Sequence, residues 1–183
     1  RTREYYFHAD GAFQLEAPPG RLTIEAVKGF EYLPAKTQAA VVSEQTTAAT
    51  LTLRRLADMP SSGWYSGDVH IHPNHVLGGL YINMDDCLLL AKGEDIHVST
   101  LLAGSVGVLA HVFDTEHFND GKADPLSTPD HLLVVQQEVR NTSAMYGHIA
   151  LLGITRFVDP FYIGQPRSAN WEDYPALYAP AMA

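Results

Sequence analysis

The chain has 183 residues, of which 46% are hydrophobic and 18% are charged. This composition permits a packed core and excludes a largely disordered chain. The formal net charge of −9 argues against nucleic acid or an anionic membrane surface as the main partner, because both favour a basic face. No stretch reaches the roughly 18 apolar residues of a membrane span. The single cysteine, Cys87, excludes an internal disulfide and a zinc cluster of thiolates.

The first part of the chain predicts β-structure. Several short segments alternate apolar and polar residues, and turn residues such as Asp10-Gly11 and Pro18-Pro19-Gly20 separate them. These segments are residues 5–7, 13–16, 22–27 and 50–53. Short strands at close spacing are typical of a small β-sandwich, which we expect over residues 1–60.

The pattern changes at about residue 64. A strand ends near His72, Asn83 can cap a helix that starts with Asp85 and Asp86, and residues 95–99 form the next expected strand. Strand, helix and strand in this order predict a βαβ unit. We therefore expect an α/β domain over residues 63–183, in which the glycine- and proline-rich residues 103–131 form a long loop.

The stretch Gly67–His72 carries the first candidate site. In a regular strand alternate residues share one face, so Asp68, His70 and His72 point to the same side. Two imidazoles in this arrangement can converge on one metal ion. Two polar residues on a solvent-facing strand give the same pattern, so the motif alone leaves both interpretations open.

Two later residues complete a candidate ligand set. Glu138 ends a buried-type strand over residues 132–138, and His148 opens another strand. Three imidazoles and one carboxylate suit zinc, manganese or iron. Sites in α/β proteins collect at the carboxyl ends of strands, where Glu138 falls; His148 begins its strand, so a loop must bring it back.

These motifs, in this order, resemble those of the PHP (polymerase and histidinol phosphatase) superfamily of metallohydrolases. Gly67–His72 resembles its Gly-Asp-Leu-His-x-His motif, and Glu138, Arg140 and Gly147-His148 resemble its later motifs. Residues 10–32 resemble a carboxypeptidase-regulatory-like sandwich, and the combination is similar to the carbaryl-hydrolase-like branch. The resemblance implies an α/β fold: a partial (β/α) barrel of PHP type, preceded by a small all-β sandwich module.

The resemblance also implies an activity. One to three divalent ions would lower the pKa of bound water to about 7, for attack on an ester, carbamate, amide or phosphoester of a small molecule. Asp68 would orient a ligand histidine or accept a proton. Arg140 would stabilise negative charge or form a structural salt bridge. Proteins of this type lead us to expect a periplasmic or secreted location.

The sequence departs from the family in two places. The family's Thr-Asp-His triplet is absent, since the matching stretch is Ser99–Leu102; Glu94, Asp95 and His97 are candidate replacements. The family's final Asp-x-His has no match before Ala183. We therefore expect this chain to be part of a longer parent protein.

Three alternatives remain. A cupin also uses His-x-His, but it needs a glutamate four or five residues later, where Val76 and Leu77 stand. An amidohydrolase barrel opens similarly but is not expected behind this sandwich. The third alternative is a non-catalytic secreted binding or scaffolding module whose metal site is degenerate.

Overall fold

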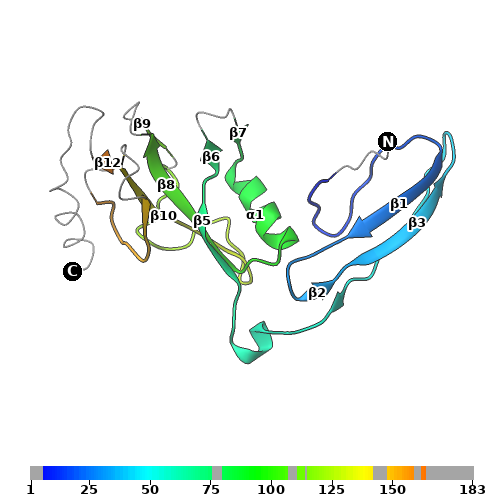
Figure 1. Cartoon of the computed structure of the whole chain (residues 1–183), viewed down its shortest axis with the longest axis horizontal. Helices are drawn as coiled ribbons and strands as arrows, with labels where there is room; N and C mark the ends of the chain where they lie inside the picture. The colour runs from blue at the N-terminus through cyan, green and yellow to red at the C-terminus, as the bar shows by residue number, and fades with distance from the viewer. Residues whose placement is uncertain are drawn as a thin grey trace. The chain divides into compact units, whose positions relative to one another are not determined.

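The computed structural model describes residues 6–75, 80–106, 111–113, 115–141, 148–158 and 162–163. The chain divides into two compact units (Figure 1). The first unit comprises Arg1–Ser66 with Leu89–Ile96, and the second comprises Gly67–Leu88 with His97–Ala183. The division falls within helix α1 (Met84–Gly93), so the two ends of this helix belong to different units.

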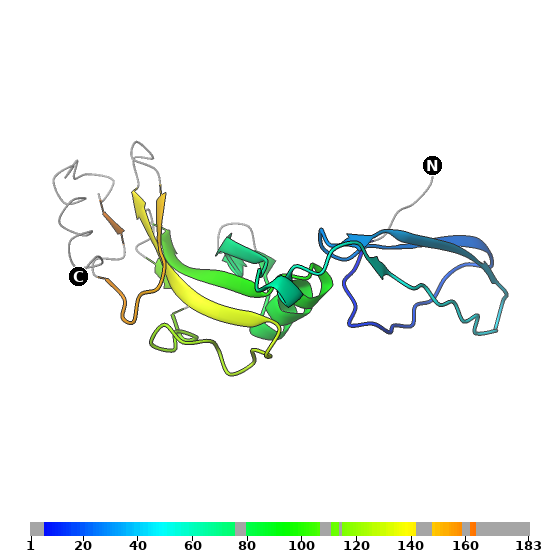
Figure 2. The ribbon, with the colours of Figure 1, turned by 90° about the horizontal axis from the view of Figure 1, so that it is seen from below.

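The first unit contains two small antiparallel sheets. Strand β1 (Gly20–Ala26) pairs with β3 (Ala35–Val41), and β2 (Tyr32–Leu33) pairs with β4 (Arg54–Arg55). A short 3₁₀ helix, η1 (Pro60–Ser62), precedes the second unit in the chain. Figure 2 shows β1 and β3 running side by side. Exposed and partly buried side chains alternate along both strands, so one face of this sheet is partly shielded from water.

The strand predictions for this unit are partly confirmed. The strand expected at residues 22–27 is observed as β1, whereas residues 13–16 and 50–53 are not in strands. The strand expected at residues 5–7 is also absent at positions 6 and 7; position 5 lies outside the described residues. Alternation alone does not make a strand, because the backbone groups also need a partner. Strand β3 has a weak sequence signal, since its partly buried positions carry only Ala, Thr and Val.

Asp95 is the centre of an ion-pair network within the first unit. Its carboxylate contacts Lys28 Nζ at 3.2 Å and Arg55 Nη2 at 3.0 Å. Lys28 and Arg55 also lie over the ring of Tyr32. Burial alone would lower the pKa of the Arg55 guanidinium, but interactions with Tyr32, Asp95 and Asp58 raise it above its ordinary value. Arg55 therefore stays charged, and the network attaches the chain after α1 to the β-strands of its unit.

The second unit is built on a curled sheet with strand order β11-β10-β8-β5 (Figures 1 and 2). Strands β5 (Gly67–Ile71), β8 (Val98–Val106) and β10 (Leu132–Asn141) are parallel, and β11 (His148–Leu151) is antiparallel to β10. The shorter strands β9 (His111–Phe113) and β12 (Tyr162–Ile163) pair with β8 and β10 respectively. Strands β6 (Asn74–His75) and β7 (Leu80–Tyr81) form a separate antiparallel pair.

The expected order of strand, helix and strand is observed as β5, α1 and β8, including the start of the helix, but β8 begins at Val98 and not at residue 95 as predicted. Asp86 donates its backbone N–H to Asn83 Oδ1 at 2.8 Å, and Asn83 donates its backbone N–H to Asp86 Oδ2 at 3.2 Å. This reciprocal pair is a capping box, which satisfies amide groups that the first helical turn leaves unpaired. Cys87 directly follows Asp86 in α1, and its side chain is buried.

The expectation of an α/β fold with a partial (β/α) barrel of PHP type is wrong. Among the residues that the structure describes, the fold is mostly β with one α-helix and is 10% helical, and the main sheet is a curled four-stranded half-barrel. Residues 115–131 form turns in place of a second crossover helix, since Gly121, Pro125 and Pro129 disfavour one. Strand β8 also extends to Val106, and β9 follows it, so the loop expected over residues 103–131 is shorter than predicted.

Two buried glutamines attach the chain after β11 to the sheet. Gln137 donates from Nε2 to the Val158 carbonyl and accepts the Val158 N–H at Oε1, both at 2.7 Å. Gln136 accepts the Ile154 N–H at 3.0 Å. Val139, Leu151, Ile154 and Val158 form a buried apolar cluster beside these bonds.

Within the part of the chain that the structure describes, no helix is long and apolar enough to cross a membrane.

Candidate metal centre

His70, His72 and Glu138 come together in the second unit. Their ligand atoms all lie within 4.8 Å of one another. His70 Nε2 is 3.3 Å from Glu138 Oε1, and His72 Nε2 is 3.2 Å from Glu138 Oε2. The two Nε2 atoms are 3.1 Å apart. Two imidazole nitrogens and a carboxylate in such close contact could hold a metal ion.

The sheet explains how these residues meet. His70 is the penultimate residue of β5, His72 directly follows that strand, and Glu138 belongs to β10, while β8 lies between the two strands. Two strand spacings separate β5 from β10 by about 10 Å. Glu138 lies one residue beyond the paired Gln137 and Ala103, which places it level with Gly104 of β8. Because Gly104 has no side chain, the ligand side chains have room to meet over β8.

A β-bulge in β5 decides which side chains face Glu138. Asp68 pairs with Ser99 and Ile71 pairs with Leu101, so β5 has one residue more than β8 over this stretch. Asp68 and Ile71 are partly buried, whereas Val69 and His70 are exposed. The regular alternation expected for Asp68, His70 and His72 is therefore wrong, and the bulge separates Asp68 from the two histidines.

Burial differs sharply among the three residues. Glu138 is completely buried, the His72 side chain is 8% exposed and the His70 side chain is 50% exposed. A buried carboxylate is costly unless positive groups or hydrogen-bond donors compensate it. The two imidazoles, or a cation between them and Glu138, supply this compensation. Of the three residues, His70 alone faces solvent with a large part of its side chain.

The donor set fits a divalent transition metal. Zinc, iron and manganese accept mixed nitrogen and oxygen ligands from histidine and carboxylate. Catalytic zinc sites typically use three protein ligands and keep another position open, whereas structural sites are closed by four. The three converging groups and the solvent-facing edge resemble the open type.

Asp68 lies next to the cluster but contacts it through the backbone. Its Oδ1 atom accepts the His70 N–H at 3.0 Å. This bond joins the carboxylate to the peptide group of a ligand, on the bulged segment of β5. The predicted role of Asp68 in orienting a ligand histidine or accepting a proton stays a prediction.

Arg140 and His148 are placed by their backbones, and their side chains lie outside the described part of the structure. These residues pair directly between β10 and β11. Because β11 is antiparallel to β10, its first residue lies near the carboxyl end of β10, two residues beyond Glu138. The antiparallel strand thus brings His148 back without a long loop. The ligand role of His148 and the catalytic role of Arg140 remain predictions.

The candidate replacements for the missing family triplet have other partners. Asp95 contacts Lys28 and Arg55, and Glu94 Oε1 lies 3.0 Å from His8 Nε2. His97 is buried and stacks on His131, with ring centroids 5.7 Å apart. His97 directly precedes the first residue of β8, and His131 directly precedes the first residue of β10. They therefore lie at the end of the sheet opposite to Glu138.

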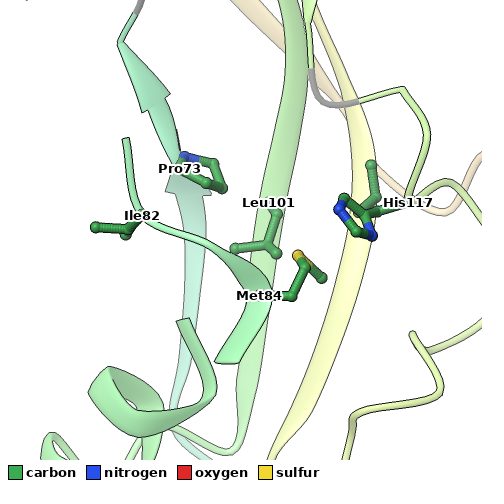
Figure 3. Close-up of a pocket in the computed structure, with 6 residues that line it drawn as sticks. Pro73, Ile82, Met84, Leu101 and His117 are labelled. Carbon is green, nitrogen blue, oxygen red and sulfur yellow. The ribbon is translucent and has the colours of Figure 1, made fainter. Parts of the chain in front are cut away.

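A small hollow lies on the other face of the sheet from Glu138. Figure 3 shows His117, Met84 and Leu101 around it, with Pro73 and Ile82. His117 Nδ1 lies 3.8 Å from the buried Asp124 carboxylate. Leu101 pairs with Ile71, which places it on the face away from His70 and His72. The hollow is thus separate from the candidate metal centre.

Sequence reasoning misses the contribution of Gly104. An isolated glycine inside a strand often marks a close approach of other groups, but the sequence pattern assigns residues 103–131 to a loop.

Comparisons with known proteins do not add residues to the site. No protein-family model matches the chain, and no similar curated protein or solved structure was found.

Proposed function

We propose that the chain carries the metal site of a metal-dependent hydrolase that acts on an ester, carbamate, amide or phosphoester of a small molecule. The observation that carries the proposal is the convergence of His70, His72 and Glu138 across β8. Its position in the carboxyl-terminal half of β10 supports it, because sites of parallel sheets collect toward the carboxyl ends of the strands, although β10 continues to Asn141 beyond the predicted end at Glu138. The resemblance of Gly67–His72 to the PHP motif adds the reaction class and the expected periplasmic or secreted location.

The residues of the site would have different roles in metal binding and catalysis. Glu138 and His72, both largely buried, would hold zinc, manganese or iron, and the more exposed His70 would hold it from the solvent side. The ion would supply Lewis acidity, which lowers the pKa of water and polarises a substrate oxygen. His148, on the strand next to Glu138, is our proposed further ligand, and additional ligands of this kind would allow up to three ions. Arg140 would stabilise negative charge on the substrate.

Metal content and activity test the proposal together. The wild-type chain, the double variant His70→Ala/His72→Ala and the control His8→Ala would be dialysed against metal-free buffer. We expect about one or more equivalents of zinc, manganese or iron in the wild type and control, and none in the double variant. Turnover of nitrophenyl esters, carbamates or phosphodiesters should follow metal content. Equal metal content in all three proteins would contradict the site.

One observation favours a second candidate function, a binding or scaffolding module with a degenerate metal site. Strand β8 crosses the centre of the site but presents Leu102 and Gly104 on the Glu138 face, neither of which has a ligand group. A chain that binds the ion stoichiometrically but turns over none of the substrate classes would support this second function and contradict the first.

A further inference from the structure

Asp68 and the bulge of β5 form a local unit beside the metal ligands. The bulge places Asp68 and Ile71 on the partly buried face and leaves His70 on the face of Glu138. Without the extra residue, regular alternation would put Asp68, His70 and His72 on one face and Ile71 on the other. The observed arrangement of both Asp68 and the histidines therefore depends on this bulge.

The bulge leaves the backbone N–H of His70 in need of a local acceptor. Asp68 Oδ1 accepts it at 3.0 Å, two residues back in the chain. Short polar side chains make such bonds to nearby peptide groups and stabilise non-regular backbone. The bond fixes the peptide of His70, from which its imidazole extends to within 3.3 Å of Glu138.

We propose that Asp68 is a positioning residue that sets the affinity of the site for its metal. Its carboxylate acts through the His70 peptide and the bulge, not by contact with the ion or the substrate. The proposal rests on the proposed function, because that function identifies His70, His72 and Glu138 as the metal ligands. Its structural half, that Asp68 holds the His70 peptide in place, applies to the metal-free chain as well. An asparagine at this position keeps the acceptor oxygen, whereas an alanine removes it, so these two variants separate the hydrogen bond from the negative charge.

The test compares the wild type with Asp68→Asn, Asp68→Ala and His70→Ala. Titration with Co²⁺ measures affinity, and the visible spectrum of bound Co²⁺ reports the ligand geometry. We expect Asp68→Ala to bind Co²⁺ about tenfold or more weakly with a changed spectrum, as for other residues that orient metal ligands. Asp68→Asn should retain the wild-type spectrum and an affinity within about threefold. Wild-type affinity and spectrum in Asp68→Ala, alongside a loss in His70→Ala, would overturn the proposal.

Amide hydrogen exchange of His70 in the metal-free chains tests the structural half separately. We expect the His70 amide to exchange faster in Asp68→Ala than in the wild type, and Asp68→Asn to restore protection. Equal exchange in all three overturns the proposal. Should Asp68→Ala fail to fold, Asp68→Asn decides, because a large loss of affinity there would show that the hydrogen bond is not the cause. A wild-type chain that binds no ion contradicts the proposed function and with it the effect of Asp68 on metal affinity, while the exchange rates still decide whether Asp68 holds the His70 peptide.

Discussion

Arg55 and Asp95 form a partly buried ion pair, with 3.0 Å between Arg55 Nη2 and Asp95 Oδ2. The Asp95 side chain is 7% exposed and also contacts Lys28. Asp95 has a backbone φ of 55°, a conformation that aspartate and asparagine tolerate better than most residues. The residue thus combines an unusual backbone position with two cationic partners.

Replacing Asp95 should destabilise the first unit. Asp95→Ala leaves Lys28 and Arg55 without their shared carboxylate, so we expect a loss of about 2 kcal/mol in the free energy of unfolding, below the range for fully buried pairs because both cations are partly exposed. The matched control is Asp58→Ala, which removes an exposed partner of the same Arg55 and should cost less than about 1 kcal/mol. Urea denaturation measures both. Equal losses in the two variants would show that burial of Asp95 is unimportant.

Gly29 allows the same region to pack closely. Its φ is +44°, and a Cβ atom there would lie 2.6 Å from the Glu94 carbonyl oxygen and 2.7 Å from Asp95 Cβ. Gly29→Ala should therefore lower stability by more than the roughly 1–2 kcal/mol of the left-handed backbone conformation alone. Gly11→Ala is the control, since Gly11 also has a positive φ but nothing lies within 4 Å of the point that a Cβ atom would occupy there. Thermal denaturation that shows equal shifts for the two variants would refute the steric contribution.

Gln137 should be essential for the position of the chain near Val158. Gln137→Leu removes both hydrogen bonds from the Gln137 side chain to Val158, so the buried N–H and carbonyl of Val158 lose their partners. We expect a loss of about 2–4 kcal/mol, from the desolvation of two backbone groups. Faster amide exchange at Val158 should accompany it. The exposed Gln38→Leu on β3 is the control, and we expect it to change stability by less than about 0.5 kcal/mol.

Gly104 should limit the metal affinity of the proposed centre. A side chain at this position would enter the space over β8 in which His72 and Glu138 meet, so Gly104→Val should weaken binding of Zn²⁺ or Co²⁺ by about tenfold or more. The control is Gly67→Ala on β5, where a Cβ would lie 3.4 Å from the Val98 carbonyl oxygen and away from the cluster. Calorimetric titration checks the two affinities, with circular dichroism to confirm folding. Unchanged affinity in Gly104→Val would mean that the ligands do not need this space.

The parts of the structure that depend on local signals were predictable. Asn83 and Asp86 have the residue types of a capping box, and the apolar run that follows them forms α1. Glu138 and the His-x-His pair have the residue types of metal ligands, and the structure brings these three together. Their meeting point follows from the parallel order of β5, β8 and β10, which the expected βαβ unit implied for the first two strands.

The parts that depend on pairing between distant segments were not predictable. Nothing in the sequence of residues 67–72 marks the extra residue of the bulge, because the bulge exists only relative to β8. The antiparallel return of β11 beside β10 likewise replaces the expected alternation of strands and helices. The expectation of a barrel assumes that the one observed βαβ unit is repeated through the domain. Residues 115–131 form turns in place of the helix that a second such unit would need.

Strand β5 is the last strand in the order of the curled sheet, and among the described residues it pairs with β8 alone. An ion held by His70, His72 and Glu138 would join this edge strand to β10, with β8 enclosed between the two. It would then act as a reversible cross-link between segments far apart in the chain, and folding and metal binding would be coupled. A chelator would release the edge of the sheet, and the rate at which a protease cuts near β5 would report how much of the protein holds its ion.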